Sequence, residues 1–306
     1  MEYHNPVLLK ESIDALVLNP SGTYIDCTFG GGGHSKEVLS RLSSKGKLIA
    51  FDQDIDVLPN LISENEQFNF VPQNFRHLKR YLKIYGIEQV DGVLADLGVS
   101  SHQFNEATRG FSFRFDADLD MRMRQDDRMT AADFVNRSTA EELQSVFSKY
   151  GEVRNSKSLA EEIVRKRKLK SIKSINDFLT AIGPLVRGSR PKYLAQVFQA
   201  IRIEINDEMG ALIDLLNQAT QVIKPGGTLV VISYHSLEDR LVKNFMKSGN
   251  AEGKHQSDFY GNIYRPFKLI SKKAIAPNQT EIENNSRARS AKMRIAERTE
   301  QEIPNT

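Results

Sequence analysis

Four consecutive glycines, Gly30–Gly33, constrain this chain more than any other feature of its sequence. Strand-forming residues precede them from Thr23 to Cys27, and apolar residues at helical spacing follow them from Val38 to Leu42. We expect Ser35 to cap the start of that helix. Consecutive glycines permit positive φ angles and remove every Cβ, so a ligand can contact the backbone directly. The pattern predicts a ligand site where a first β-strand is followed by its helix.

The residues around the glycines favour one nucleotide cofactor over another. A dinucleotide site needs three glycines spaced G-x-G-x-x-G, and the third position here is Ser35 or Lys36. The predicted second strand, 47–51, ends before Asp52, roughly 20 residues after the glycines, where a carboxylate can bind a ribose diol. An acidic residue placed to bind a ribose, without a loop for a pyrophosphate, favours S-adenosylmethionine (SAM) as the cofactor. An NAD-type ligand and a purely structural glycine turn are the alternatives.

Length and composition indicate an ordinary folded protein with a sizeable core. The chain has 306 residues, of which 40% are hydrophobic and 26% charged. Its single cysteine excludes an internal disulfide framework, and its six histidines show no ligand spacing, so we expect no metal site. The first residues do not resemble a signal peptide, and no apolar run approaches the roughly 18 residues of a membrane span. We expect a cytoplasmic protein that does not enter the membrane.

Strand and helix patterns alternate in the first hundred residues, as in a parallel sheet covered by helices on both faces. Expected strands are 23–27, 47–51, 68–71, 90–95, 228–232, an edge strand within 265–270 and a closing strand within 286–295. Between Asn105 and Arg202 only helical patterns occur, one of them opening with the capping box of Thr139 and Glu142. We therefore expect an α/β fold with a doubly wound, mostly parallel Rossmann-like sheet. Residues 1–104 and 203–306 would form it, and residues 105–202 would be an inserted helical subdomain.

Polar residues follow several of these strands and should meet in one crevice, because ligands bind at the carboxyl ends of parallel strands. Asp96 follows the fourth strand, where a carboxylate can stabilise a sulfonium or take a proton from an acceptor amine. It could instead only cap a helix. His235 follows the fifth strand and is either a proton acceptor or a structural group. Phe75, after the third strand, could stack on adenine or pack into the core.

Two clusters of basic residues stand out because the net charge is only +3. The first contains Arg165, Lys166, Arg167 and Lys168, and the second, near the end of the chain, includes Arg287 and Arg289. Such clusters are either solvated surfaces or contacts to phosphate oxygens. We favour RNA or DNA as the large substrate.

Several long blocks of sequence resemble the bacterial 16S ribosomal RNA (cytosine-N4)-methyltransferase family. They are 26–35, 96–101, 110–113, 119–123, 196–203, 231–240 and 287–292. The resemblance extends over nearly the whole chain. It implies a class I SAM-dependent methyltransferase that acts on the N4 amine of a cytidine in the decoding centre of the small ribosomal subunit, as a monomer or homodimer.

The resemblance also implies roles for individual residues. The SAM contacts would be Gly32, Gly33, His34, Asp52, Phe75, Asp96 and Gln103. Cytosine N4 is a poor nucleophile, because its lone pair is delocalised into the ring, and the resemblance leaves open which group activates it. Our working hypothesis is Asp96, with help from Ser100 or His235. The alternative from another class is a non-catalytic protein that binds SAM and RNA, or acts in ribosome assembly.

Overall fold

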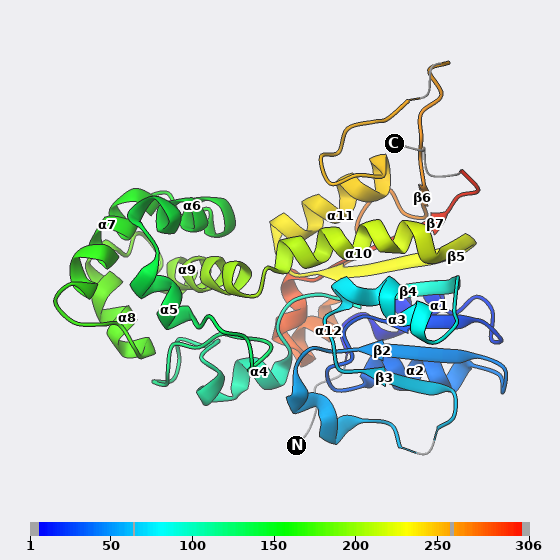
Figure 1. Ribbon diagram of the computed structural model, residues 1–306, viewed down its shortest axis with the longest axis horizontal. Coiled ribbons are helices and arrows are strands. Elements are labelled where there is room, and N and C mark those ends of the chain that lie inside the picture. The colour runs from blue at the N-terminus through cyan, green and yellow to red at the C-terminus, as the bar shows by residue number, and fades with distance from the viewer. Residues whose placement is uncertain (1–5, 64, 258–259, 302–306) are drawn as a thin grey trace. The chain divides into compact units, whose positions relative to one another are not determined.

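The computed structural model describes residues 6–63, 65–257 and 260–301. The described chain divides into two compact units (Figure 1). Unit 1 combines the residues up to Gly98 with those from Gly210 onward, and unit 2 contains Val99–Met209. None of the helices in these described ranges is both long and apolar enough to cross a membrane.

Unit 1 is built on a seven-stranded sheet with the strand order β3-β2-β1-β4-β5-β7-β6. The strands are β1 (Thr23–Asp26), β2 (Lys47–Phe51), β3 (Phe68–Val71), β4 (Val90–Asp96), β5 (Ile223–Ser233), β6 (Phe267–Leu269) and β7 (Lys292–Arg298). Strands β1 to β5 pair in parallel, whereas β7 is antiparallel to β5 and β6 antiparallel to β7. The predicted doubly wound, mostly parallel α/β fold is confirmed.

The order of the parallel strands reverses between β1 and β4, which is where open α/β sheets bind their ligands. Consecutive residues of β2 and β4 are buried, so both faces of the sheet are covered. On one face, α1 and α2 contribute Ile13 and Val38 to a core with Leu94 of β4. The helices of this unit are α1 (Leu9–Leu16), α2 (Gly33–Arg41), α3 (Leu78–Ile84), α10 (Glu208–Val222, which begins in unit 2), α11 (Ser236–Ser248) and α12 (Gln279–Asn284).

Unit 2 is helical. Its helices are α4 (Ser101–Asn105), α5 (Ala131–Arg137), α6 (Ala140–Gly151), α7 (Ser156–Arg167), α8 (Ile175–Ile182) and α9 (Arg190–Ile205). They enclose a separate apolar core that includes Phe147, Phe178 and Phe198. The predicted capping box at the start of α6 is present, with Thr139 as N-cap and Glu142 as its partner.

Three local predictions were wrong. Helix α2 begins at Gly33 with Gly32 as N-cap, because the Ser35 hydroxyl donates to Asp26 instead of capping the helix. The segment expected to be a helix after β2 is a 3-10 helix, Ile55–Asn60, interrupted by a proline. The predicted closing strand combines two elements, a 3-10 helix at Ser286–Ser290 and then β7.

Candidate active site

The glycine loop after β1 is shaped so that side chains are excluded from it. Gly32 has a φ of +74°, and a Cβ there would lie 3.0 Å from the ring of Phe29. A Cβ on Gly33 would lie 2.1 Å from the ring of Pro6. The loop therefore needs glycine for its left-handed backbone and for close contact with its neighbours. This cradle, at the N-terminus of α2, fits a ligand that is held by backbone groups.

Asp52, directly after β2, reaches across to the glycine loop. Its Oδ2 accepts a hydrogen bond from the Gly30 amide at 2.8 Å, and its Oδ1 accepts one from the Asp54 amide at 2.9 Å. Burial raises the pKa of Asp52 to about 6, although these two amide donors oppose the rise. Each carboxylate oxygen has a second lone pair, so Asp52 can still accept hydrogen bonds from ribose hydroxyls.

Asp96 ends β4, beside the carboxyl end of β5, where its backbone is paired with Ile232. Its Oδ1 accepts a hydrogen bond from the Tyr234 hydroxyl at 2.8 Å, and its Oδ2 lies 3.9 Å from Nδ1 of His34. Burial raises the pKa of Asp96 to about 6, and His34 and Tyr234 oppose that rise. Among the described residues, Oδ1 of Asp96 thus has a hydrogen-bond donor and Oδ2 has none.

His34 is buried in the first turn of α2 and faces Asp96. Its Nε2 lies 3.2 Å from the carbonyl oxygen of Val7. A carbonyl can only accept, so this hydrogen bond requires a proton on Nε2, and the other ring nitrogen, Nδ1, faces Oδ2 of Asp96.

Three acidic side chains are concentrated around the glycine loop: Asp26, Asp52 and Asp96. The charge of Asp26 raises the pKa of both other carboxyls, so the three groups interact. Asp26 itself accepts hydrogen bonds from the Thr28 amide and the Ser35 hydroxyl. In the described ranges, no lysine or arginine pairs with any of the three. These three carboxylates therefore suit a cationic ligand with hydroxyl groups. SAM, with its sulfonium, ammonium and ribose, has this chemistry.

Comparison with known proteins decides the family. The sequence model of the MraW methylase family matches residues 1–299 of this chain. The chain belongs to the MraW methylase family.

Relatives within the MraW family cover almost the whole chain. A ribosomal RNA small subunit methyltransferase H of Bacteroides thetaiotaomicron is 55% identical over 299 residues, which are 97% of this chain and 98% of the relative. Proteins of the same name from Phocaeicola vulgatus and Christiangramia forsetii are 56% and 54% identical, over 97% of this chain and 97% and 98% of their own lengths.

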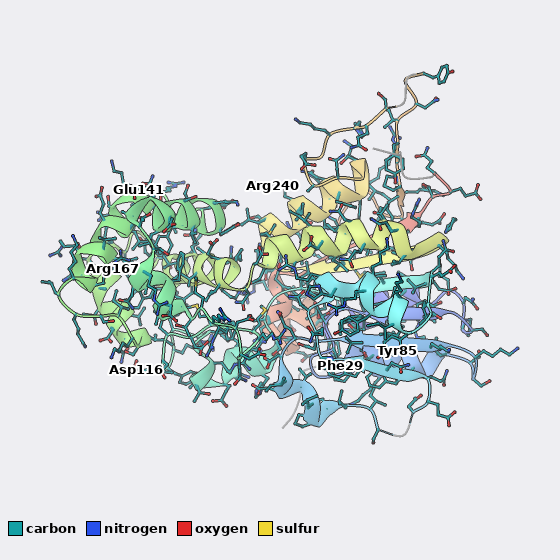
Figure 2. The ribbon with its side chains drawn as sticks, in the orientation of Figure 1. Phe29, Tyr85, Asp116, Glu141, Arg167 and Arg240 are labelled. Atoms are coloured by element: carbon teal, nitrogen blue, oxygen red, sulfur yellow. The ribbon has the colours of Figure 1, made fainter. Side chains whose placement is uncertain are left out.

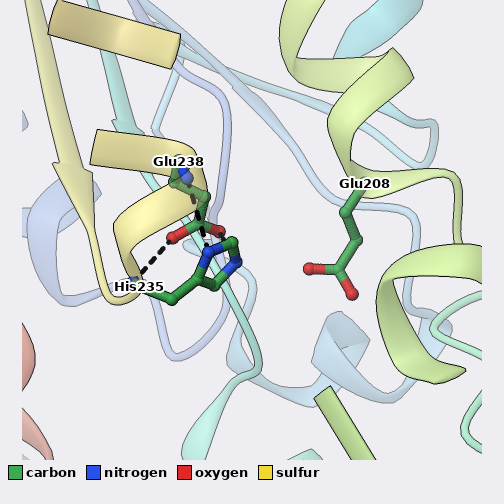
Figure 3. Close-up of side chains that lie close together, drawn as sticks. All are labelled: Glu208, His235 and Glu238. Atoms are coloured by element: carbon green, nitrogen blue, oxygen red, sulfur yellow. Dashed lines mark hydrogen bonds and ion pairs between the residues drawn. The ribbon is translucent and has the colours of Figure 1, made fainter. Parts of the chain in front are cut away.

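His235 of this MraW-family chain has a structural role that is visible in Figure 3. It is the N-cap of α11, and its Nδ1 accepts from the Glu238 amide at 3.4 Å. Its Nε2 lies 3.1 Å from Glu238 Oε1, close enough for an ion pair if the ring is protonated. The side chain is 9% exposed. The structural alternative for His235 thus has direct support, and its catalytic role stays a prediction.

Phe75 does not belong to the apolar cores found among the described residues. It opens a 3-10 helix, Phe75–His77, whose N-cap is Asn74, and its side chain is half-buried. Stacking on adenine stays a prediction, and packing into the core stays its alternative.

Ser100 and Gln103 lie in unit 2 and cap α4 together. The Ser100 hydroxyl accepts from the Gln103 amide at 3.1 Å, and the Gln103 side-chain oxygen accepts from the Ser100 amide at 3.0 Å. This capping box accounts for both side chains locally. A catalytic role for Ser100 and a cofactor contact for Gln103 stay predictions.

The basic cluster at the end of α7 is partly paired within the protein. Arg165 forms a salt bridge with Glu162 at 2.6 Å, and Lys166 lies 3.9 Å from the same carboxylate. The guanidinium of Arg167, labelled in Figure 2, donates to the carbonyl oxygen of Val135 at 2.7 Å. Lys168 is the C-cap of α7. Near the end of the chain, Arg289 is exposed and Arg287 half-buried.

Tyr234 was missed as a site residue, although it lies within a block that carried the resemblance. A signal for it was available, because Tyr234 directly follows β5 and precedes His235 at the sheet edge that carries Asp96. Asp26 was also missed, because an acid within a strand end, before the glycines, resembles an ordinary turn residue.

Proposed function

We propose that this MraW-family chain is a SAM-dependent methyltransferase whose substrate is the RNA of the small ribosomal subunit. The observation that carries this proposal is the group of three acids around the glycine loop, at the strand-order reversal between β1 and β4. Its chemistry suits SAM, and the relatives named above support ribosomal RNA as the substrate. Such a substrate would make the protein cytoplasmic, and we expect a monomer or homodimer.

We further propose the N4 amine of a decoding-centre cytidine as the methyl acceptor. When bound, SAM supplies a methyl carbon that passes to the N4 lone pair, while the electrons of the broken carbon–sulfur bond stay on sulfur. The amine must then release one proton to give a neutral product. Asp96 is our candidate for accepting it, because a pKa of about 6 leaves the carboxylate mostly ionised at pH 7 and above.

An acceptor beside the amine would also address the weak nucleophilicity of N4. A carboxylate oxygen that accepts an N–H hydrogen bond increases electron density on that nitrogen. Oδ2 of Asp96 accepts no hydrogen bond from the part of the chain that the structure describes, and could take this role. Ser100 and His235 remain possible helpers in our proposal, although both side chains already cap helices.

The cofactor contacts in this proposal come mainly from unit 1. Backbone groups of Gly32 and Gly33 would line the cofactor, His34 and Asp96 would face its charged portion, and Asp52 would accept from the ribose. Phe75 would stack on adenine, and Gln103 is a further predicted contact. We infer that the helical insertion recognises the RNA, with Arg165, Lys166, Arg167 and Lys168 contacting phosphates, assisted by Arg287 and Arg289.

The proposal is tested by incubating the protein with methyl-labelled SAM and either unmethylated small subunits or naked 16S RNA. We expect label to be recovered as N4-methylcytidine from at least one substrate. Tight SAM binding without transfer to either substrate would favour the non-catalytic alternative. Binding of NADH but not SAM would contradict the cofactor assignment.

Asp52→Ala tests the ribose contact directly. Loss of its hydrogen bonds should weaken SAM binding by roughly 1–3 kcal/mol, about 5- to 150-fold in Kd. The matched control is Asp14→Ala, because Asp14 is an exposed acid on α1 that pairs with Lys10 and Arg41. Calorimetric titration of both variants should separate them; equal affinities would remove Asp52 from the cofactor site.

A further inference from the structure

Tyr234 is held at three points around the end of β5. Its backbone amide donates to Glu238 Oε2 at 2.9 Å, and its hydroxyl donates to Asp96 Oδ1 at 2.8 Å. Its ring lies against Gly98, where a Cβ would be 3.6 Å from ring carbon Cδ2. Gly98 has a φ of +93°, a conformation that favours glycine. The tyrosine therefore has little freedom to turn away from Asp96.

This arrangement makes the two oxygens of Asp96 unequal. Oδ1 is committed to the Tyr234 hydroxyl, whereas Oδ2 lies 3.9 Å from His34 Nδ1, beyond hydrogen-bond distance. The Asp96 backbone amide is fixed separately, by donating to the Thr28 hydroxyl at 2.8 Å. Backbone and carboxylate are thus both anchored, and Oδ2 is the oxygen left to accept from a ligand.

We propose that Tyr234 is a positioning residue for methyl transfer, whose hydroxyl fixes the Asp96 carboxylate so that Oδ2 receives the amine of the methyl acceptor. The inference rests on the proposed function and adds a residue to it. Tyr234 does not itself need to touch the substrate. Its hydroxyl remains protonated, and therefore a donor, because burial and the neighbouring Asp96 raise its pKa well above its ordinary value.

The hydrogen bond from Tyr234 also supports the ionised form of Asp96. The groups that act on Asp96 are His34 and Tyr234, which lower its pKa, and Asp26 and Glu238, whose charges raise it. Removing the Tyr234 hydroxyl removes one of the two groups that lower the pKa of Asp96. Asp96 should then be ionised only at higher pH, and the acidic limb of the rate profile should move upward.

The test is Tyr234→Phe, which removes the hydroxyl and keeps the ring. Single-turnover methylation of small subunits is measured across pH 5–9 with SAM saturating, together with SAM affinity and thermal melting. We expect the rate at pH 7 to fall about tenfold or more, and the midpoint of the acidic limb of the pH–rate profile to shift to higher pH by about half a unit or more. SAM affinity should stay within about threefold of the wild-type value. The matched control is Tyr24→Phe, because Tyr24 is a buried tyrosine of the same unit whose hydroxyl is hydrogen-bonded to the backbone of Asn19.

A double variant provides a second readout that does not depend on small changes in folding. If Tyr234 acts through Asp96, Tyr234→Phe should add almost nothing to the loss already caused by Asp96→Asn. Additive losses, or an unshifted pH profile in an active Tyr234→Phe variant, would overturn the role of Tyr234 alone. A wild-type protein that transfers no methyl group would instead overturn the proposed function, and this inference with it.

Discussion

Asp96 is a residue whose charge is costly when no ligand is bound. Its pKa in the folded protein is about 6, above the ordinary value of 3.8. A carboxyl with a raised folded-state pKa contributes stability that is fully present below the unfolded pKa and is lost as pH rises through the folded pKa. Between about pH 4 and pH 6 the folded protein should therefore lose the stability that protonated Asp96 contributes. The ionised carboxylate would act in methyl transfer at higher pH.

Asp96→Asn should relieve this cost. The amide oxygen can still accept from Tyr234, and the amide nitrogen can donate toward His34 Nδ1, without any charge to bury. We expect the free energy of unfolding to rise by roughly 1–3 kcal/mol at pH 8 relative to wild type, with a smaller gain at pH 5, while methyl transfer falls about 10²-fold or more. Denaturant titrations at the two pH values measure the difference.

Asp91→Asn is a control with the opposite sign. Burial alone would raise the pKa of Asp91, but hydrogen bonds from Lys224, the Thr23 amide and Asn19 lower it below its ordinary value. Its ionised form therefore stabilises the fold above the unfolded pKa, and that contribution is lost as pH falls. Asp91→Asn should destabilise at pH 8. If both asparagine variants changed stability in the same direction, the charge argument would fail.

At the scale of elements, the sheet was predictable and its connections less so. Strands such as β2 and β4 are buried on both faces, so their short apolar runs are visible in sequence. The start of α2 depends on a tertiary contact, since Asp26 takes the Ser35 hydroxyl that would otherwise cap the helix. Polar residues at strand ends were visible in the sequence, whereas the hydrogen bond from Tyr234 to Asp96 was not predictable, because it depends on the pairing of β4 with β5.

The basic end of α7 gives a prediction at the same scale. Arg165, Lys166 and Lys168 are replaced by glutamine, and Arg167 is retained because its bond to Val135 holds α7 in the helical core. RNA affinity should fall, and the slope of log K against log salt should flatten by about 1–2, since each lost phosphate contact on single-stranded RNA removes about 0.7. SAM affinity should not change. Filter binding over a salt series provides the slope.

Helix α3 offers a control with the same change in charge. Lys79, Arg80 and Lys83 are exposed on it and have no part in the proposed site. Their replacement by glutamine should leave the salt slope nearly unchanged. Equal flattening of the salt slope in both triple variants would indicate a nonspecific effect of net charge. No flattening in either variant would show that the α7 cluster is a solvated surface that does not contact RNA.

For the molecule as a whole, the relevant fact is that two units have separate apolar cores. The core of unit 2, with Phe147 and Phe178, shares no residue with the cores under the sheet of unit 1, such as that of Ile13 and Leu94. The sequence indicated this division through the loss of strand patterns within 105–202. Because these cores have no residue in common, a single cooperative transition is not required.

We therefore expect calorimetry of the intact chain to resolve two unfolding transitions. A ligand that binds only the folded state adds about 2.7 kcal/mol at a hundredfold excess over Kd, so SAM should raise the transition of unit 1, which contains the glycine loop and Asp52. The other transition should move less. Asp52→Ala at the same SAM concentration should lose most of the shift. The opposite result would be a single transition without SAM and a single transition at higher temperature with SAM. It would show that the two cores unfold together and that cofactor binding stabilises the entire chain.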